Sequence, residues 1–128
     1  MANTIINSTN APAPIGPYSQ AVLANNVLYV SGQIAINPAT DSMVLDDIET
    51  ETHQVMQNLQ AILSEAGLDF TNVVKCSIFV KDLNNFARIN TIYGSYFNQM
   101  PPARETVEVS RLPKDVNVEI SCIAVKPA

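Results

Sequence analysis

The sequence predicts an α+β fold in which two helices cover one face of a mixed β-sheet. Two segments repeat apolar residues with the helical period, and five runs rich in valine and isoleucine are typical of strands. Their order along the chain is hairpin, helix, strand, helix and hairpin, which favours one sheet with two crossover helices. Composition changes nowhere abruptly, so we expect a single domain spanning residues 1–128.

The N-terminal hairpin is predicted over residues 18–24 and 26–36, after a short strand at 4–6. Both longer runs are rich in β-branched and aromatic residues, and Asn25-Asn26 between them is a pair that favours turns.

The first helix is predicted from Asp47 to Ala66, where apolar residues recur at spacings of three and four, and Gly67 follows as a C-terminal stop. A second helical pattern covers residues 84–98 and ends before two consecutive prolines.

The remaining strands are predicted at residues 72–80, 105–110 and 116–125, and the last two are expected to form a hairpin about Leu112-Pro113. This hairpin would follow the second helix and complete the sheet.

In the register of that hairpin, Glu119 lies opposite Thr106 and diagonal to Arg104. Because side chains alternate between the faces of a strand, Val107 and Val118 would face the helices. Arg104, Thr106 and Glu119 would then share the face without helices.

The face without helices is predicted to be mixed in character. Lys75, Ser77 and Glu119 alternate there with apolar residues. Because large exposed apolar patches are rare on soluble monomers, we expect other subunits to cover this face. A partly solvated antiparallel face is the alternative.

Charge and hydropathy limit the partners of the chain. The net charge is −5, the sequence pI is about 4.6, and the seven lysines and arginines are scattered, which argues against nucleic acid. No run approaches the roughly 20 apolar residues of a membrane span, and the N-terminus lacks a basic region followed by an apolar stretch. We therefore expect a cytoplasmic protein without a membrane partner.

The cysteine and histidine pattern offers no metal site. Cys76 and Cys122 lie far apart in apolar runs, where buried free thiols are the expected outcome. His53 is the only histidine, which excludes a His-rich metal site and an ordinary catalytic triad.

Arg104 and Glu119 are the candidate functional charges. Arg104 could form a plain ion pair with Glu119 or Glu108, or it could hold the carboxylate of a small ligand in a bidentate clamp. The residue pattern alone favours the ion pair. Near Ser31, Gly32 would let a ligand approach the backbone closely, although the surrounding sequence is neither a nucleophile elbow nor a phosphate loop.

Four stretches carry a resemblance that spans nearly the whole chain: APAPIGPYSQAV, LYVSGQIAINP, VVKCSIFVKDLNNFARIN and PPARETVEVSRLPKDVNVEISCIAV. Together they resemble the Rid family of reactive intermediate deaminases, specifically the RidA subfamily. The most discriminating part is the PAR that holds Arg104, followed by VEV, RLP and the VEI that holds Glu119.

The resemblance implies a chorismate-mutase-like fold and a homotrimer, with sheets facing the threefold axis and ligand clefts between subunits. It implies a 2-iminobutanoate/2-iminopropanoate deaminase, which hydrolyses enamines and imines such as 2-aminoacrylate to 2-keto acids and ammonia. The resemblance further implies a small carboxylate substrate and no requirement for a cofactor or a metal.

The resemblance also assigns roles to individual residues. Arg104 would hold the substrate carboxylate, Glu119 would manage the attacking water or the departing nitrogen, and Tyr18 would line and partly close the pocket. The residues expected to contact the substrate are Ser31, Gly32, Asn90 and Thr106.

Two features depart from the RidA pattern. The connection from Phe97 to Arg104 is short, and Glu105-Thr106 stands where a serine and a cysteine are found. Glu105 would add a negative charge next to the arginine. The alternative function is a non-catalytic module that binds a keto acid or amino acid, whereas the acidic balance argues against a ribonuclease.

Overall fold

The computed structural model describes residues 2–128, whose strands form a six-stranded sheet and a small two-stranded sheet. Across the main sheet the strands are β1 (Thr4–Ile6), β2 (Ala21–Ala24), β3 (Val27–Gln33), β8 (Val118–Val125), β6 (Val73–Val80) and β7 (Ala103–Glu108). The small sheet pairs β4 (Ile36–Asn37) with β5 (Ser42–Met43).

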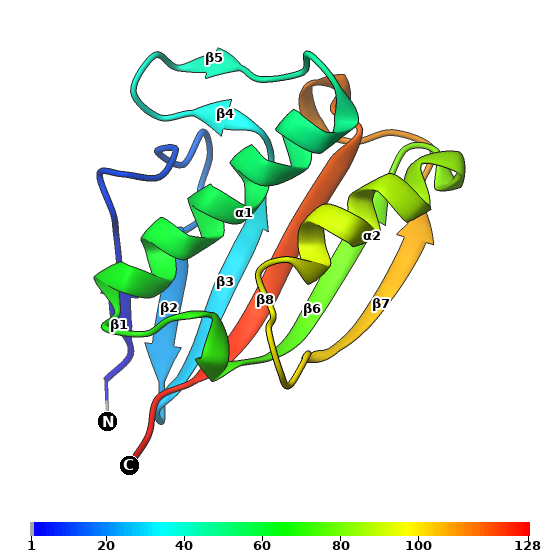
Figure 1. Ribbon diagram of the computed structural model, residues 1–128. Helices are drawn as coiled ribbons and strands as arrows, with labels where there is room; N and C mark the ends of the chain where they lie inside the picture. Colours follow the sequence, from blue (N-terminus) through cyan, green and yellow to red (C-terminus); the bar gives the residue numbers. More distant parts are fainter. Residues whose placement is uncertain (1) are drawn as a thin grey trace.

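Two helices, α1 (Ile48–Glu65) and α2 (Phe86–Gly94), lie side by side on one face of the main sheet (Figure 1). Three short 3-10 turns, at Phe70–Asn72, Leu83–Asn85 and Pro113–Asp115, lie in the connections. The predicted α+β class, with a mixed sheet and two helices on one face, is confirmed.

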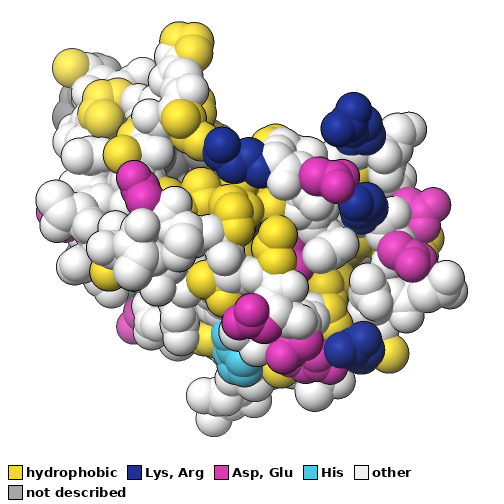
Figure 2. All heavy atoms as spheres, turned by 90° about the horizontal axis from the view of Figure 1, so that it is seen from above, with side chains coloured by type: hydrophobic (Ala, Val, Ile, Leu, Met, Phe, Trp, Pro, Cys, Tyr) yellow, Lys and Arg dark blue, Asp and Glu magenta, His cyan; other side chains and the backbone are white. Residues whose placement is uncertain are grey.

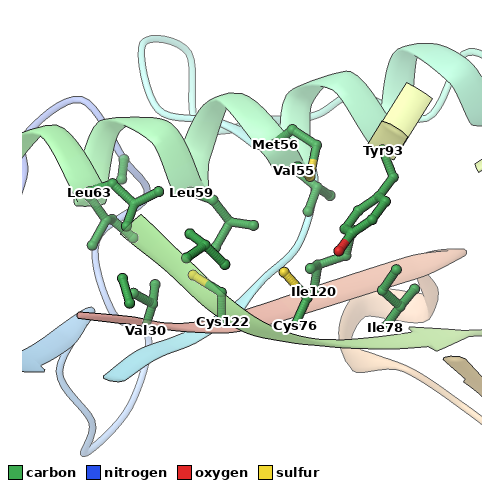
Figure 3. Close-up of a cluster of buried hydrophobic side chains, with 14 of the residues drawn as sticks. Val30, Val55, Met56, Leu59, Leu63, Cys76, Ile78, Tyr93, Ile120 and Cys122 are labelled. Atoms are coloured by element: carbon green, nitrogen blue, oxygen red, sulfur yellow. The ribbon is translucent and has the colours of Figure 1, made fainter. Parts of the chain in front are cut away.

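Helix α1 follows its sequence pattern closely. The Asp47 carboxylate accepts a hydrogen bond from Thr50 N at 2.7 Å and caps the first turn. Figure 3 shows apolar side chains of α1 pointing at the sheet, where they meet residues of β3, β6 and β8. The labelled residues of this core are Val30, Val55, Met56, Leu59, Leu63, Cys76, Ile78, Tyr93, Ile120 and Cys122.

Helix α2 is shorter than the predicted 84–98. A 3-10 turn precedes it, and the chain leaves the helix after Gly94. Tyr96 and Phe97 remain part of the core because they pack on Phe70, with both ring centroids 5.3 Å away. The apolar pattern therefore extends beyond the helix, and its last residues lie in the turn that follows Gly94.

Buried polar side chains of α1 hold neighbouring segments of the same chain in place. Glu51, only 1% exposed, accepts hydrogen bonds from Asn117 N and Asn117 Nδ2, both at 2.8 Å, just before β8 begins. Asn58 Nδ2 donates to the carbonyl oxygens of Ile34 and Ile36. The helix thereby positions both the start of β8 and the segment after β3.

The predicted C-terminal hairpin is wrong. Strand β7 pairs in parallel with β6, and β8 pairs with β6 and β3, so β6 lies between β7 and β8. The connection over 109–117 therefore skips one strand. Helix α2 supplies the crossover that a parallel β6–β7 pair needs.

The register reverses the predicted faces of β7. Cys76 of β6 pairs with Arg104 on one side and with Cys122 on the other, so Arg104 shares the helix-covered face. Phe79 pairs with both Val107 and Glu119, which therefore lie on the face without helices. We call this second face the open face.

Both cysteines are free and buried, as expected, and burial raises the pKa of both thiols. Among residues 2–128, no helix is long and apolar enough to cross a membrane.

Candidate functional site

Four of the predicted site residues surround one cavity on the open face. Tyr18, Ser31, Gly32 and Glu119 all line a space of about 450 Å³, together with residues of the N-terminal segment and Pro113. We call these four residues the Glu119 cluster. Figure 2 views the molecule from above, where β4 and β5 lie, and shows hydrophobic side chains in a hollow with acidic and basic side chains scattered around it.

A β-bulge in β3 forms the wall of this cavity. Val30 pairs with Cys122 and Gln33 with Ile120, so β3 advances three residues where β8 advances two. Ser31 and Gly32 lie in this irregularity, and bulges often redirect a side chain near a functional site.

Gly32 makes room for the Glu119 carboxyl group. A Cβ atom at Gly32 would collide with the carboxylate and lie 2.9 Å from Glu119 Cδ. The sequence suggested that this glycine admits a ligand to the backbone. In the structure the side chain of Glu119 takes that space.

The hydroxyl of Ser31 is already used within the chain. Ser31 Oγ donates to the Ser19 carbonyl at 2.6 Å, and Ser31 N donates to the Gln20 carbonyl at 2.9 Å. These bonds hold the segment that carries Tyr18 against β3. The side chain of Tyr18 is 50% exposed at the rim of the cavity.

Gln20 is a positioning residue that the sequence motifs did not single out. Its side chain is 2% exposed, accepts from Ser8 N and donates to the carbonyl oxygens of Ser8 and Pro12 at 3.0 and 2.9 Å. It thereby fixes the loop that forms the outer wall of the cavity. The sequence shows only a single glutamine at this position, and it does not reveal that the side chain is buried.

Glu119 has an unusual environment for a carboxylate. Burial raises the pKa of its carboxyl group above the ordinary value. Among residues 2–128, no basic side chain lies within ion-pair distance of it. The predicted intrachain ion pair between Arg104 and Glu119 is therefore absent.

The remaining predicted residues form a second cluster at α2 and β7. Arg104 and Thr106 alternate along β7 on the helix-covered face, since they pair with Cys76 and Ile78. Asn90 is exposed on α2, four residues after Phe86 and three before Tyr93, so it shares their side of the helix. We call Arg104, Thr106 and Asn90 the Arg104 cluster.

Arg104 contacts two aromatic rings that sequence reasoning missed. Its Cζ atom lies 5.4 Å from the ring centroid of Phe86 and 5.0 Å from that of Tyr93. The i, i+7 spacing of these rings on α2 was visible in the sequence, but the position of β7 beside α2 was not.

Two buried hydroxyl groups of this region lack partners among residues 2–128. They are Thr106 Oγ1 and the Tyr93 hydroxyl. Figure 3 shows Tyr93 directed from α2 toward the sheet, with its hydroxyl in the core near Ile120. Burial raises the pKa of this phenol, so it stays protonated.

The two clusters do not meet within one chain. They lie on opposite faces of the sheet, and β7 is separated from β8 by β6, which amounts to about 10 Å along the sheet. A small ligand could not touch Arg104 and Glu119 of the same chain.

Glu105 does not lie next to the guanidinium of Arg104, contrary to the expectation. As the next residue of the strand it points to the open face, where it accepts from Ser77 Oγ and pairs with Lys75 Nζ at 3.0 Å. The hydrogen bond from Ser77 and the Lys75 ammonium lower the pKa of Glu105. Its charge is therefore used away from Arg104.

Comparison with known proteins gives a consistent family. Residues 8–126 match the family described as Endoribonuclease L-PSP. A RutC family protein of Pyrococcus horikoshii is 51% identical, and the match covers 95% of this chain and 97% of that protein.

Two solved structures extend the comparison. A protein of the conserved Rid protein family from Yersinia pestis has a TM-score of 0.94 and 50% identity, covering 97% of this chain and 99% of that one. TdcF of E. coli, solved with bound serine, has a TM-score of 0.93 and 38% identity, with the same coverage. The chain therefore belongs to the Endoribonuclease L-PSP family, which includes the RutC and Rid proteins, as its sequence motifs indicated.

Proposed function

We propose that this protein is an enamine/imine deaminase that acts as a homotrimer. It would hydrolyse 2-aminoacrylate and related intermediates to 2-keto acids and ammonia, the reaction of a 2-iminobutanoate/2-iminopropanoate deaminase. The observation that carries the proposal is that the Arg104 cluster and the Glu119 cluster each hold one part of a complete site. Arg104 has no carboxylate partner among residues 2–128, the partly buried Glu119 carboxyl group has no basic partner among the same residues, and the two lie on opposite faces of the sheet.

A contact between subunits would bring the two clusters together. Arg104 lies on β7, which forms one edge of the sheet. The open face exposes apolar side chains at Tyr29, Val107 and Val125, which are 51%, 42% and 41% exposed. A copy of the chain covering that face would bury them. Arg104 of one subunit could then reach the Glu119 cavity of its neighbour.

In such a site Arg104 binds the substrate carboxylate with two parallel N–H···O bonds, which fixes the C2 carbon of the imine. Thr106 completes this seat through its backbone, and Asn90 adds a polar group beside it. Tyr18 covers the pocket, while Ser31 and Gly32 form its wall. These roles follow the family resemblance and agree with the composition of the two clusters.

Glu119 handles the protons of the hydrolysis. After the enamine has tautomerised to the imine, the oxygen of water bonds to C2, and the π electrons of the C=N bond move to nitrogen, which gains a proton. Water gives up one proton in this addition, and a second proton then converts the amino group to an ammonium group. The C–N bond breaks with its electrons on nitrogen, ammonia leaves, and loss of the remaining hydroxyl proton forms the ketone. A carboxyl group whose pKa is raised by burial can both accept the proton of water and return one to nitrogen.

The test is the release of pyruvate from 2-aminoacrylate generated in situ. We expect Arg104→Ala to lower kcat/KM at least 100-fold, because it removes a charge-assisted bidentate contact worth several kcal/mol. Glu119→Gln should lower kcat and retain carboxylate binding. Full activity of the Arg104→Ala protein would refute the assigned mechanism.

A binding module without catalysis is the second candidate, and the serine bound to the related TdcF favours it. That module would use the same Arg104 seat for an amino acid or keto acid. Saturable serine or pyruvate binding by wild-type protein, with no acceleration of 2-aminoacrylate hydrolysis, would decide for this candidate.

The family description also suggests RNA cleavage as a function to test. The single histidine contributes to neither cluster, because His53 Nδ1 lies 2.9 Å from the Tyr96 hydroxyl in the helical layer. RNA cleavage that copurifies with the protein and is lost in a single-site variant would support that activity instead.

A further inference from the structure

The guanidinium of Arg104 is held by aromatic rings in place of a carboxylate. Its Cζ atom is 5.4 Å from the centroid of Phe86 and 5.0 Å from that of Tyr93, and both rings come from α2. A cation in contact with ring faces is attracted to their π electrons, more strongly when water is partly excluded. Arg104 is half-buried, so these contacts hold the charge in place.

No carboxylate among residues 2–128 lies within ion-pair distance of Arg104. Arg88 offers the contrast, because its Nε and Nη2 atoms both donate to Glu49 at 2.7 Å. Glu105, the carboxylate nearest to Arg104 in sequence, points to the other face and pairs with Lys75. The in-plane donors of Arg104 are therefore left for another anion.

The two rings differ in how firmly they are fixed. Tyr93 is 4% exposed and packs on Phe97, with the ring centroids 4.9 Å apart and the ring planes tilted by 46°. Phe97 in turn packs on Phe70. Phe86 stands at the first position of α2 and is 37% exposed. Replacement of Phe86 therefore disturbs the contact with Arg104 more than it disturbs the core.

We propose that Phe86 and Tyr93 are positioning residues that orient the Arg104 guanidinium and leave its N–H groups free for a planar carboxylate. Ring faces accept no conventional hydrogen bond, so they orient the cation without using its donors. This inference rests on the proposed function in one respect, the assignment of Arg104 as the carboxylate seat. It adds that α2 sets the affinity of that seat through two aromatic side chains.

The experiment compares pyruvate binding by calorimetry in wild-type protein and in Phe86→Leu, which keeps an apolar side chain and removes the ring. We expect Phe86→Leu to weaken pyruvate binding about fivefold, the effect of one partly exposed cation–π contact. Phe86→Tyr restores a ring and should recover most of the affinity. Leu83→Ala, an exposed apolar position just before α2, is the matched control and should bind as wild type.

Kinetics add a readout that a loss of folding would not give. In the 2-aminoacrylate assay, Phe86→Leu should raise KM about fivefold with little change in kcat, because the contact acts on the carboxylate seat in ground and transition states alike. Thermal melts at equal protein concentration check that the variants are folded.

Three results would overturn the inference. They are unchanged pyruvate affinity in Phe86→Leu, equal weakening in Phe86→Leu and Phe86→Tyr, and a wild-type protein that binds no pyruvate. Failure of the deaminase proposal is distinguishable from these, since it leaves pyruvate binding and its dependence on the Phe86 ring intact while turnover is absent.

Discussion

The Arg104 cluster and the Glu119 cluster differ in the surroundings that the fold gives to the ionisable group of each. Two aromatic rings contact the guanidinium of Arg104, which has no ion-pair partner in the part of the chain that the structure describes, residues 2–128. The carboxyl group of Glu119 is packed beside Gly32 and partly withdrawn from water, which raises its pKa. One cluster is therefore suited to binding an anion and the other to moving a proton. The Arg104 cluster contains no carboxyl group, and the Glu119 cluster contains no cation.

The largest expected effect comes from mixing two inactive variants. If each site combines Arg104 of one subunit with Glu119 of the next, mixed trimers of Arg104→Ala and Glu119→Gln contain some intact sites. With random assembly of equal amounts, about a quarter of the sites are intact in a cyclic trimer. We expect 2-aminoacrylate turnover to recover to that level after joint denaturation and refolding.

Each variant refolded alone is the control for this experiment. No recovery in the mixture, although mass measurements show mixed trimers, would mean that the two clusters do not form a shared site.

The second effect concerns the packing of Gly32 against Glu119. Gly32→Ala should lower kcat about 100-fold, because the added Cβ displaces the carboxylate by an ångström or more. Thermal stability should change little, since the displaced group is the end of a flexible side chain. Gly94→Ala is the matched control, because its Cβ would meet nothing within 4 Å. Equal activity of Gly32→Ala and wild type would separate this glycine from catalysis.

A smaller effect is expected in the pH dependence of stability. The pKa of Glu119 is raised in the folded state, so the folded protein binds this proton more tightly than the unfolded chain. Stability from this group is fully present below the ordinary carboxyl pKa of the unfolded chain, and it is lost as the pH rises from that value through the folded pKa. Glu119→Gln should remove this loss of stability with rising pH.

The measurement is the melting temperature of wild type and Glu119→Gln from pH 4 to pH 8 at fixed protein concentration, because oligomers melt in a concentration-dependent way. Parallel curves for the two proteins would contradict the raised pKa.

The smallest effect is expected at Glu105. Its carboxylate points away from Arg104 and is shared between Lys75 and Ser77. Glu105→Gln should therefore leave the affinity for pyruvate unchanged in calorimetry. A change as large as that of a ring-removing variant at Phe86 would mean that the charge of Glu105 reaches the ligand.

Much of the fold was predictable because its signals are local. The apolar period of α1, its Asp47 cap and the alternation in β6 each depend on residues a few positions apart. The end of α2 was misjudged for the same reason. Tyr96 and Phe97 contact Phe70, which lies before β6. The same aromatic residues would also suit a further turn of helix, so the sequence pattern does not distinguish the two arrangements.

The site was predicted as a set of residues and not as an arrangement. The family motifs named both clusters, but the assumed hairpin put Arg104 and Glu119 on one face. The sequence near Pro113 supports a turn, and a turn there occurs as a short 3-10 segment. A turn does not specify whether the next strand pairs with the previous one or with the strand beyond it. That choice depends on long-range pairing with β6.

By itself, the sequence determined the class of the fold, most of its elements and the residue types available for chemistry, because propensity and periodicity act over short distances. The tertiary structure alone decided which strands are neighbours, that Arg104 rests on aromatic rings of α2, and that Glu119 lies against Gly32 on the other face. These contacts join segments far apart in the chain. Their energies depend on which surfaces are buried together, which no local pattern records.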